Sequence, residues 1–243
     1  MIQKLFKISY KINSLYYIIM ETLKRFPNKN IFEVRGVKFY LPNKLDTINR
    51  ALIVDKRFNE QRELNYISKF IHPGDLVLDI GANIGNHSLY FSQILGAKVI
   101  AFEPNKSICN ILVSNAYINH ANIIAHNCAV GNKNGRVNLF IGNYCKRNKG
   151  AVEVVESKAG SIKMIKLDDL NLKPKFIKID IEGFESKAID GMVKTLKSKP
   201  PILIEIKDKN LTEVLNKLYA LGYKLDRKLF DDNYVFKMRG IHE

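Results

Sequence analysis

The chain has 243 residues, of which 46% are hydrophobic and 10% aromatic, and its formal net charge is +15. This length and composition support one core of ordinary size with a small appendage, and they exclude a disordered chain. No segment reaches the roughly 20 consecutive apolar residues that a membrane-spanning helix requires. The N-terminus also lacks the small-residue cleavage site of a signal peptide, so we expect neither feature.

The cysteines and the basic charge bear on compartment and partners. Cys109, Cys128 and Cys145 are odd in number and widely spaced, which indicates reduced thiols and predicts a cytoplasmic protein. The positive charge suggests a polyanionic partner. However, the lysines are spread along the chain, with no dense basic block and no aromatic-basic RNA motif. A lysine-rich solvated surface is therefore the simpler interpretation, and the sequence gives no strong nucleic-acid signal.

Residues 1–26 place apolar side chains at steps of three and four, which predicts an amphipathic helix that ends before Pro27. Lysines surround the apolar stripe, and two interpretations stay open. The helix packs on its own domain or on a second subunit of a homodimer, or it lies on the inner face of a membrane. Residues 31–41 predict a small hairpin that turns at Arg35 and Gly36. We interpret residues 1–58 as an N-terminal appendage of this helix and hairpin.

Residues 59–243 alternate between helix and strand patterns, which predicts a doubly wound, Rossmann-like α/β sheet that is mostly parallel. Segment 136–167 is expected to add β hairpins or a long functional loop. Segment 224–238 predicts a terminal hairpin whose last strand runs antiparallel to the others. The predicted strands are 76–80, 98–102, 122–127, 176–181 and 201–206, and the predicted helices are 59–71, 87–95, 106–119, 185–196 and 211–221.

A glycine turn follows the first of these strands, in the sequence LVLDIGANIGNHSLYF at residues 76–91. Gly81 and Gly85 allow a sharp turn and the close approach of a ligand. A nicotinamide fingerprint has three glycines, as GxGxxG, to hold a pyrophosphate. Here Asp79 precedes the turn, where it would repel a pyrophosphate and attract an ammonium group. Because S-adenosylmethionine has an ammonium group and no phosphate, the pattern favours it as the cosubstrate.

Two further positions extend this predicted cosubstrate site. Glu103 ends the second strand, about 20 residues beyond Gly81, where dinucleotide folds place the carboxylate that binds the ribose hydroxyls. Asn127 and Ala129 follow the third strand. We expect them either to contact the adenine or to form an ordinary turn.

Residues 176–185 read FIKIDIEGFE and combine a buried-strand pattern with several charges. Strand alternation places Lys178 and Asp180 on one face, and a buried lysine requires a partner, either Asp180 or Glu205. Ligands bind at the carboxyl ends of parallel strands, so Asp180, Glu182 and Glu205 are expected to converge there. Methyl transfer to a hydroxyl requires alignment and removal of its proton. One of these acids can act as the base, or all three can hold a divalent cation.

Two neighbouring residues are interpreted more simply. His87 begins the helix after the glycine turn, and we expect it to have no part in the chemistry. Glu185 is expected to match the charge at its helix N-terminus and to orient the loop before it.

Six motifs of the chain are VLDIGANIGNHS (77–88), AFEPN (101–105), AVG (129–131), LDDL (167–170), KIDIEGFE (178–185) and PPILIEI (200–206). Together they resemble the FkbM family of S-adenosylmethionine-dependent methyltransferases. The resemblance implies methylation of a hydroxyl, on a sugar of a polysaccharide or glycolipid or on a small secondary metabolite. It also implies that Glu185 is a signature acid beside Asp180 and Glu182. The residues that it assigns to the cosubstrate are Asp79, Gly81, Asn83, Gly85 and Glu103.

Two other functions stay open. An RNA ribose 2'-O-methyltransferase would suit the net charge and would use Asp180, Lys187 and Glu205. A catalytically silent scaffold would be anchored by its basic helix to a membrane-bound glycan assembly, although an intact set of acids argues against it. We expect segment 136–167 and the N-terminal helix to select the acceptor, since substrate sites are built largely from loops.

Overall fold

The computed structural model describes residues 30–42, 47–140, 153–157, 159–230 and 232–238. The predicted N-terminal helix, with its membrane and homodimer interpretations, lies outside these residues. None of the described helices is long and apolar enough to cross a membrane. The two cysteines in the described chain, Cys109 and Cys128, are buried free thiols.

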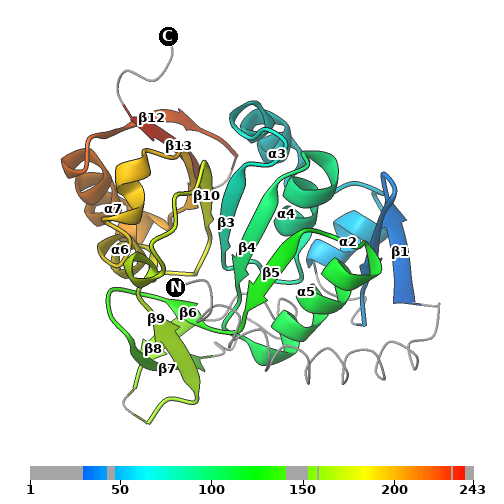
Figure 1. The fold of residues 1–243 in the computed structure, drawn as a ribbon, viewed down its shortest axis with the longest axis horizontal. Coiled ribbons are helices and arrows are strands. Elements are labelled where there is room, and N and C mark those ends of the chain that lie inside the picture. The colour runs from blue at the N-terminus through cyan, green and yellow to red at the C-terminus, as the bar shows by residue number, and fades with distance from the viewer. Residues whose placement is uncertain (1–29, 43–46, 141–152, 158, 231, 239–243) are drawn as a thin grey trace.

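A seven-stranded sheet forms the centre of the molecule (Figure 1), in the order β12-β13-β11-β10-β3-β4-β5. The chain enters at the middle of the sheet, reaches one edge through β4 and β5, and then returns to build the other half, which is the doubly wound topology. β13 is antiparallel to β11 and β12, and the remaining neighbours pair in parallel. The predicted fold class and antiparallel last strand are confirmed. The strands are β3 (Leu76–Ile80), β4 (Lys98–Phe102), β5 (Ile123–His126), β10 (Phe176–Ile179), β11 (Ile202–Glu205), β12 (Tyr223–Lys228) and β13 (Asn233–Met238).

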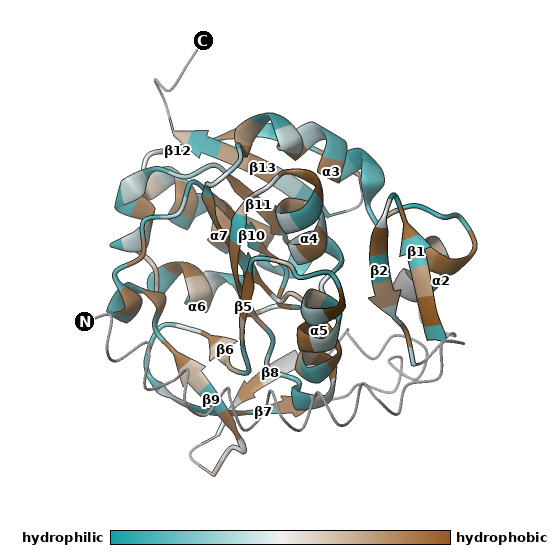
Figure 2. Cartoon of the chain, turned by 45° about the vertical axis from the view of Figure 1, so that its right-hand side comes forward, coloured by the Kyte–Doolittle hydropathy of each residue, from teal (hydrophilic) through white to brown (hydrophobic). Residues whose placement is uncertain are grey.

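Helices cover both faces of this sheet. Successive strand residues face opposite sides, so Val77 and Phe176 join a core with α3, α4 and α5, whereas Leu78 and Ile177 join a core with α6 and α7. Figure 2 shows the hydrophobic residues concentrated on the central strands. The helices are α3 (Gln61–Ile67), α4 (Asn86–Leu89), α5 (Lys106–Ile118), α6 (Glu185–Asp190) and α7 (Asp208–Ala220).

The predicted N-terminal hairpin is confirmed as β1 (Ile31–Val34) and β2 (Val37–Tyr40), followed by the short helix α2 (Thr47–Ile53). The hairpin packs on α5, where the side-chain oxygen of Asn115 accepts the backbone N–H of Tyr40 at 2.6 Å. Val34 and Phe39 belong to the same core as α3 and α5. The hairpin therefore shares a core with the sheet, and the boundary at residue 58 stays a prediction.

Segment 136–167 contributes to a separate four-stranded sheet, in the order β6-β9-β7-β8, as expected for added hairpins. Val137 and Met164 of this sheet pack against Phe184, which follows the end of β10. The small sheet thereby borders the carboxyl end of the central strands. Its strands are β6 (Ala129–Val130), β7 (Gly135–Phe140), β8 (Glu153–Glu156) and β9 (Ile162–Ile165).

Several predicted elements are shorter in the structure, and for two of them the backbone shows the reason. β10 ends at Ile179, not at residue 181, because Glu182 and Gly183 have φ values of 49° and 98° and turn the chain away from the sheet. The predicted helix 185–196 ends at Asp190. Gly191 lies so close to Gly131 that a Cβ on it would be 1.9 Å from the carbonyl oxygen of Gly131.

The predicted helix 87–95 also differs from a regular α-helix. It begins at Asn86 as α4 and continues over Tyr90–Ile94 as a π-helical turn. Such turns are uncommon inside α-helices and frequently occur near functional sites.

Candidate active site

The glycine turn after β3 has the backbone geometry that the sequence indicated. Gly81 has a φ of 79°, and a Cβ there would lie 1.7 Å from the carbonyl oxygen of Asp180. Gly85 has a φ of 94° and faces Leu112 of α5 at similarly close range. Asn83, between them, is also left-handed, with a φ of 51°. A larger residue at Gly81 would push the glycine turn away from residues 180–183, the turn after β10 that we call the acidic turn. The two turns therefore form one unit.

Glu103 lies beneath the glycine turn and is only 8% exposed. Its two carboxylate oxygens accept the backbone N–H groups of Asn83 at 3.0 Å and of Asn105 at 2.8 Å. Burial raises the pKa of Glu103 to about 7, and the two backbone N–H groups oppose that rise. The side chain of Asn127 donates to the carbonyl oxygens of Glu103 and Pro104, both at 2.9 Å. Asn127 therefore supports the loop that carries Glu103, and its predicted contact with adenine stays a prediction.

A narrow cavity separates the glycine turn from the loop after β5. Its lining is mostly apolar, and its volume of about 10 Å³ is that of a single water molecule. Ala129, predicted to border the adenine, lies in its wall. The full lining consists of Ile80, Gly81, Phe102, Pro104, Cys128, Ala129, Val130, Ile181 and Phe184.

Lys178 joins the glycine turn to the acidic turn. It is 4% exposed, and its ammonium lies 3.2 Å from the Oδ2 atom of Asp180 and 3.6 Å from the Oδ1 atom of Asp79. It also donates to the carbonyl oxygen of Gly81 at 2.9 Å. Burial would lower the pKa of Lys178, but the carboxylates of Asp180 and Asp79 raise it above its ordinary value. The predicted partner Asp180 is confirmed, whereas Glu205 makes no described ion pair with Lys178.

Asp79 is the partner of Lys178 that sequence reasoning missed. The two residues are direct register partners on β3 and β10, and they face the same core. Asp79 is fully buried, and its Oδ2 atom accepts the hydroxyl of Ser88 at 2.6 Å. Its Oδ1 atom has no hydrogen-bond partner in the described structure. The observed contacts of Asp79 are internal, and its predicted attraction for a ligand ammonium group stays a prediction.

Asp180, Glu182 and Glu205 converge as expected, with ligand oxygens that all lie within 4.8 Å of one another. Burial would raise the pKa of Asp180, but Lys178 and a hydrogen bond with Glu205 lower it overall. Burial and the Asp180 charge raise the pKa of Glu205 to about 7, against the opposing effect of Lys207. Near neutral pH, Asp180 is therefore ionised while Glu205 exchanges its proton readily. These are suitable properties for accepting a proton from a hydroxyl.

Glu185 orients the acidic turn, as expected. Its carboxylate accepts the backbone N–H of Gly183 at 2.7 Å and the side-chain amide of Asn210 at 3.3 Å. Glu185 is 1% exposed, so its contacts are with the turn and not with solvent.

A fourth acid, Glu60, reaches the same place from the start of α3, and sequence reasoning did not find it. Its carboxylate lies 3.3 Å from the Nε2 atom of His87. Burial would raise the pKa of Glu60, but its contact with His87 lowers it overall, and the charges of Asp180 and Lys178 also act on it. Asn59 and Asn86 exchange two hydrogen bonds, at 2.9 and 3.1 Å, that hold these segments together. His87 is thus buried against an acid in the first turn of α4, and its expected absence from the chemistry stays a prediction.

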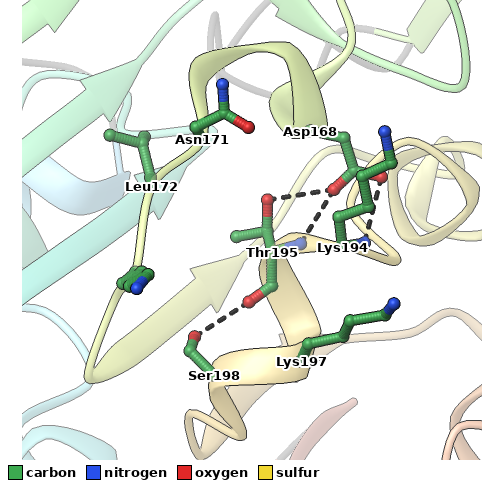
Figure 3. A pocket seen from close by; sticks show the side chains of 8 residues that line it. Asp168, Asn171, Leu172, Lys194, Thr195, Lys197 and Ser198 are labelled. Atoms are coloured by element: carbon green, nitrogen blue, oxygen red, sulfur yellow. Dashed lines mark hydrogen bonds between the residues drawn. The ribbon is translucent and has the colours of Figure 1, made fainter.

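A larger hollow, of about 350 Å³, lies elsewhere, between the segments that precede β10 and β11 (Figure 3). In it, Asp168 of the LDDL motif accepts the backbone N–H groups of Lys194 and Thr195 and the Thr195 hydroxyl. Because this hollow lies at the amino ends of the strands, opposite the acids, it is not the candidate site. Asp168 has a structural role, which is to hold the turn before β11.

The fold and the site define a class: a doubly wound α/β protein with a glycine turn, a buried carboxylate after β4 and a set of acids at one edge of the sheet. The profile of the methyltransferase FkbM domain matches residues 79–225. The chain therefore belongs to the FkbM methyltransferase family and is a methyltransferase.

A curated relative agrees with this assignment. The chain is 28% identical, over 191 residues, to the hexuronic acid methyltransferase AglP of Haloferax volcanii. The match covers 74% of this chain and 77% of that protein.

Solved structures show more distant likenesses. A putative rRNA-methylase from Clostridium thermocellum is 12% identical, with a TM-score of 0.49, over 75% of this chain and 97% of that one. TYW2 of M. jannaschii, in complex with AdoMet, is 16% identical, with a TM-score of 0.48, over 87% of this chain and 85% of that one. At this distance they add nothing to the choice of acceptor.

Proposed function

We propose that the protein transfers a methyl group from S-adenosylmethionine to a hydroxyl of a sugar, in a polysaccharide, a glycolipid or a small metabolite. The observation that carries this proposal is the convergence of Asp180, Glu182 and Glu205, whose ligand oxygens lie within 4.8 Å of one another at the carboxyl end of the sheet, beside the glycine turn.

The residues around the glycine turn fit the adenosine part of this methyl donor. Glu103 lies where ribose hydroxyls bind in related folds, and the apolar side chains of Ala129 and Val130 beside it offer a surface to the purine. The Oδ1 atom of buried Asp79, which accepts no hydrogen bond in the described structure and lies 3.6 Å from the Lys178 ammonium, offers an acceptor close to the turn. When bound, the donor supplies an activated methyl group, and the protein supplies alignment and a base.

The acids at the carboxyl end of β10 and β11 support a sugar acceptor over RNA. Carboxylates accept hydrogen bonds from sugar hydroxyls. Asp180, Glu182 and Glu205, together with Glu60, would repel the phosphates of an RNA backbone. Lys187, which the RNA alternative requires, lies over the ring of Phe184 at 4.7 Å. The name of the Haloferax relative, a hexuronic acid methyltransferase, also supports a sugar.

A divalent cation is a second element of the proposal. Three carboxylates within reach of one another match the oxygen ligands that Mg²⁺ and Mn²⁺ prefer. Such an ion would lower the pKa of an acceptor hydroxyl bound to it. Loss of turnover with EDTA and its recovery with Mg²⁺ or Mn²⁺ would support this element, and full turnover in EDTA would remove it.

The first experiment is calorimetric titration of the protein with S-adenosylhomocysteine, with NADH as the control ligand. We expect the first to bind and the second not to bind. The second experiment is transfer of radiolabelled methyl groups to a panel of mono- and oligosaccharides, with bulk RNA as the competing acceptor. Binding of NADH alone would overturn the methyl donor. Methylation of RNA alone would overturn the acceptor class.

A further inference from the structure

We propose that Arg62 and Phe230 bind the acceptor, and that they select a sugar that carries a carboxylate, a hexuronate. This inference rests on the proposed sugar O-methylation and names the subclass of sugar. It concerns residues that lie outside the glycine turn and the acids.

The two residues face each other across the edge of the site. α3 lies alongside β12, where the hydroxyl of Tyr66 donates to Asp226 at 2.6 Å. One helical turn earlier, the guanidinium of Arg62 lies over the Phe230 ring, 4.8 Å from its centroid. α3 and the loop between β12 and β13 therefore meet at Arg62 and Phe230.

Both segments are fixed to the carboxyl end of the sheet, where the acids lie. On one side, Glu60 precedes α3 and contacts His87. On the other side, the backbone N–H of Ile206, directly after β11, donates to the carbonyl oxygen of Asp232 at 2.9 Å. The Asp232 carboxylate also lies 3.5 Å from the ammonium of Lys207, which pairs with Glu205. Arg62 thus follows Glu60 by two residues, and Phe230 precedes Asp232 by two residues, so both lie near the carboxyl end of the sheet.

The chemistry of the pair suits a sugar ring with a carboxylate. Phe230 is 52% exposed, although large aromatic side chains are usually covered. An exposed ring offers an apolar surface to the C–H face of a sugar. Arg62 is exposed, and the N–H groups of a guanidinium match a carboxylate in a bidentate pair.

Charge balance distinguishes Arg62 from the other cations here. Lys178 pairs with Asp79 and Asp180, and Lys207 pairs with Glu205 and Asp232. In the part of the chain that the structure describes, no acidic side chain forms an ion pair with Arg62. A neutral sugar could accept its N–H groups but would leave its charge unpaired. A hexuronate would supply the missing carboxylate while its ring hydroxyls face the acids.

The test uses two acceptors that differ in one group, methyl glucuronide and methyl glucoside, with the full-length protein at saturating S-adenosylmethionine. For Arg62→Gln we expect KM for the glucuronide to rise about 10- to 100-fold, the range for a lost charged hydrogen bond, with little change for the glucoside. Phe230→Ala should raise KM for both acceptors. Arg227→Gln is the matched control. The Arg227 guanidinium also lies over an aromatic ring, that of Tyr66 at 4.9 Å from its centroid, in the same contact between α3 and β12.

Equal effects of Arg62→Gln on the two acceptors, or none, would overturn the inference. A separate binding measurement distinguishes this failure from failure of the proposed function. The protein saturated with S-adenosylhomocysteine is titrated with each glycoside and followed by ligand-observed NMR. Binding of the glucuronide that Arg62→Gln weakens supports the inference even if no sugar is methylated. Equal binding of both glycosides overturns it even if sugars are methylated.

Discussion

The glycine turn and the acidic turn lie side by side but are built from different interactions. Around the glycine turn, Glu103 is satisfied by backbone N–H groups and is almost fully buried. Around the acidic turn, Asp180, Glu205 and Lys207 are held mainly by one another's charges and are partly exposed. Backbone contacts survive most substitutions, whereas side-chain charges can be changed one residue at a time. We infer that the first half of the site, around the glycine turn, suits an invariant ligand. The second half, around the acidic turn, suits a variable acceptor.

The largest effect that we expect is a loss of turnover when Asp180, in the second half of the site, is substituted. Asp180→Asn keeps the shape of the side chain but removes the charge, and turnover should fall about 10²- to 10⁴-fold, the usual contribution of a general base. Affinity for S-adenosylhomocysteine should be nearly unchanged in titration calorimetry. Glu213→Gln, on the surface of α7, is the matched control. Turnover close to wild type in Asp180→Asn would place the base elsewhere.

Lys178 tests whether the two halves depend on each other. Lys178→Met leaves Asp79 and Asp180 without their cation, and the free energy of unfolding should fall by about 3–5 kcal/mol, as for other broken buried pairs. Urea denaturation measures this change. Lys175→Met, at an exposed position before β10, should change stability by no more than about 0.5 kcal/mol. Similar midpoints for the two variants would show that Lys178 does not hold the turns together.

Glu103 should affect only the first half. Glu103→Gln should weaken S-adenosylhomocysteine about 10- to 100-fold, since a charged hydrogen bond contributes about 1.5–3 kcal/mol. The pKa of Glu103, raised to about 7, adds a pH dependence. Below pH 7 the protonated carboxyl accepts ribose hydroxyls less well, so affinity should fall as pH falls. Calorimetry from pH 6 to 8 tests this, and a flat profile for the wild type would contradict it.

The smallest effect concerns the protonation of Glu205. Its pKa is raised to about 7, so below that pH Glu205 is protonated, and its hydrogen bond to Asp180 occupies the carboxylate that acts as the base. The kcat/KM for the acceptor should therefore rise with pH through about 7 and fall about tenfold per pH unit below it. In Glu205→Gln, the fall of kcat/KM below about pH 7 should disappear. The pH dependence of S-adenosylhomocysteine binding, which Glu103 causes, should remain. Persistence of the fall in Glu205→Gln would assign it to another group.

The sequence predicted those parts of the molecule that depend on local pattern. β3 and β4 have the predicted bounds, because buried parallel strands are short apolar runs between breakers. The convergence of Asp180, Glu182 and Glu205 followed from the rule that strand ends meet at one edge. The pairing of Asp79 with Lys178 depends on the register between two strands far apart in the chain, and no local pattern encodes it.

Glu60 shows a second reason why some site residues were missed. It reaches His87 only because its backbone is left-handed, with a φ of 54°. This conformation is uncommon for residues with a side chain, so a sequence gives no reason to expect it. The contact of Arg62 with Phe230 depends in the same way on how α3 lies against β12.

The position of β13 has a consequence for the order in which the protein assembles during synthesis. β13 lies between β11 and β12, although it is made after both. While the ribosome has not yet delivered Asn233–Met238, β11 is an uncovered edge and β12 has no neighbour in the sheet. An uncovered edge strand is prone to pair with other chains. Glu205, at the end of β11, has Asn233 as its register partner, so the surroundings of Glu205 are completed only after β13 is made, later than those of the glycine turn.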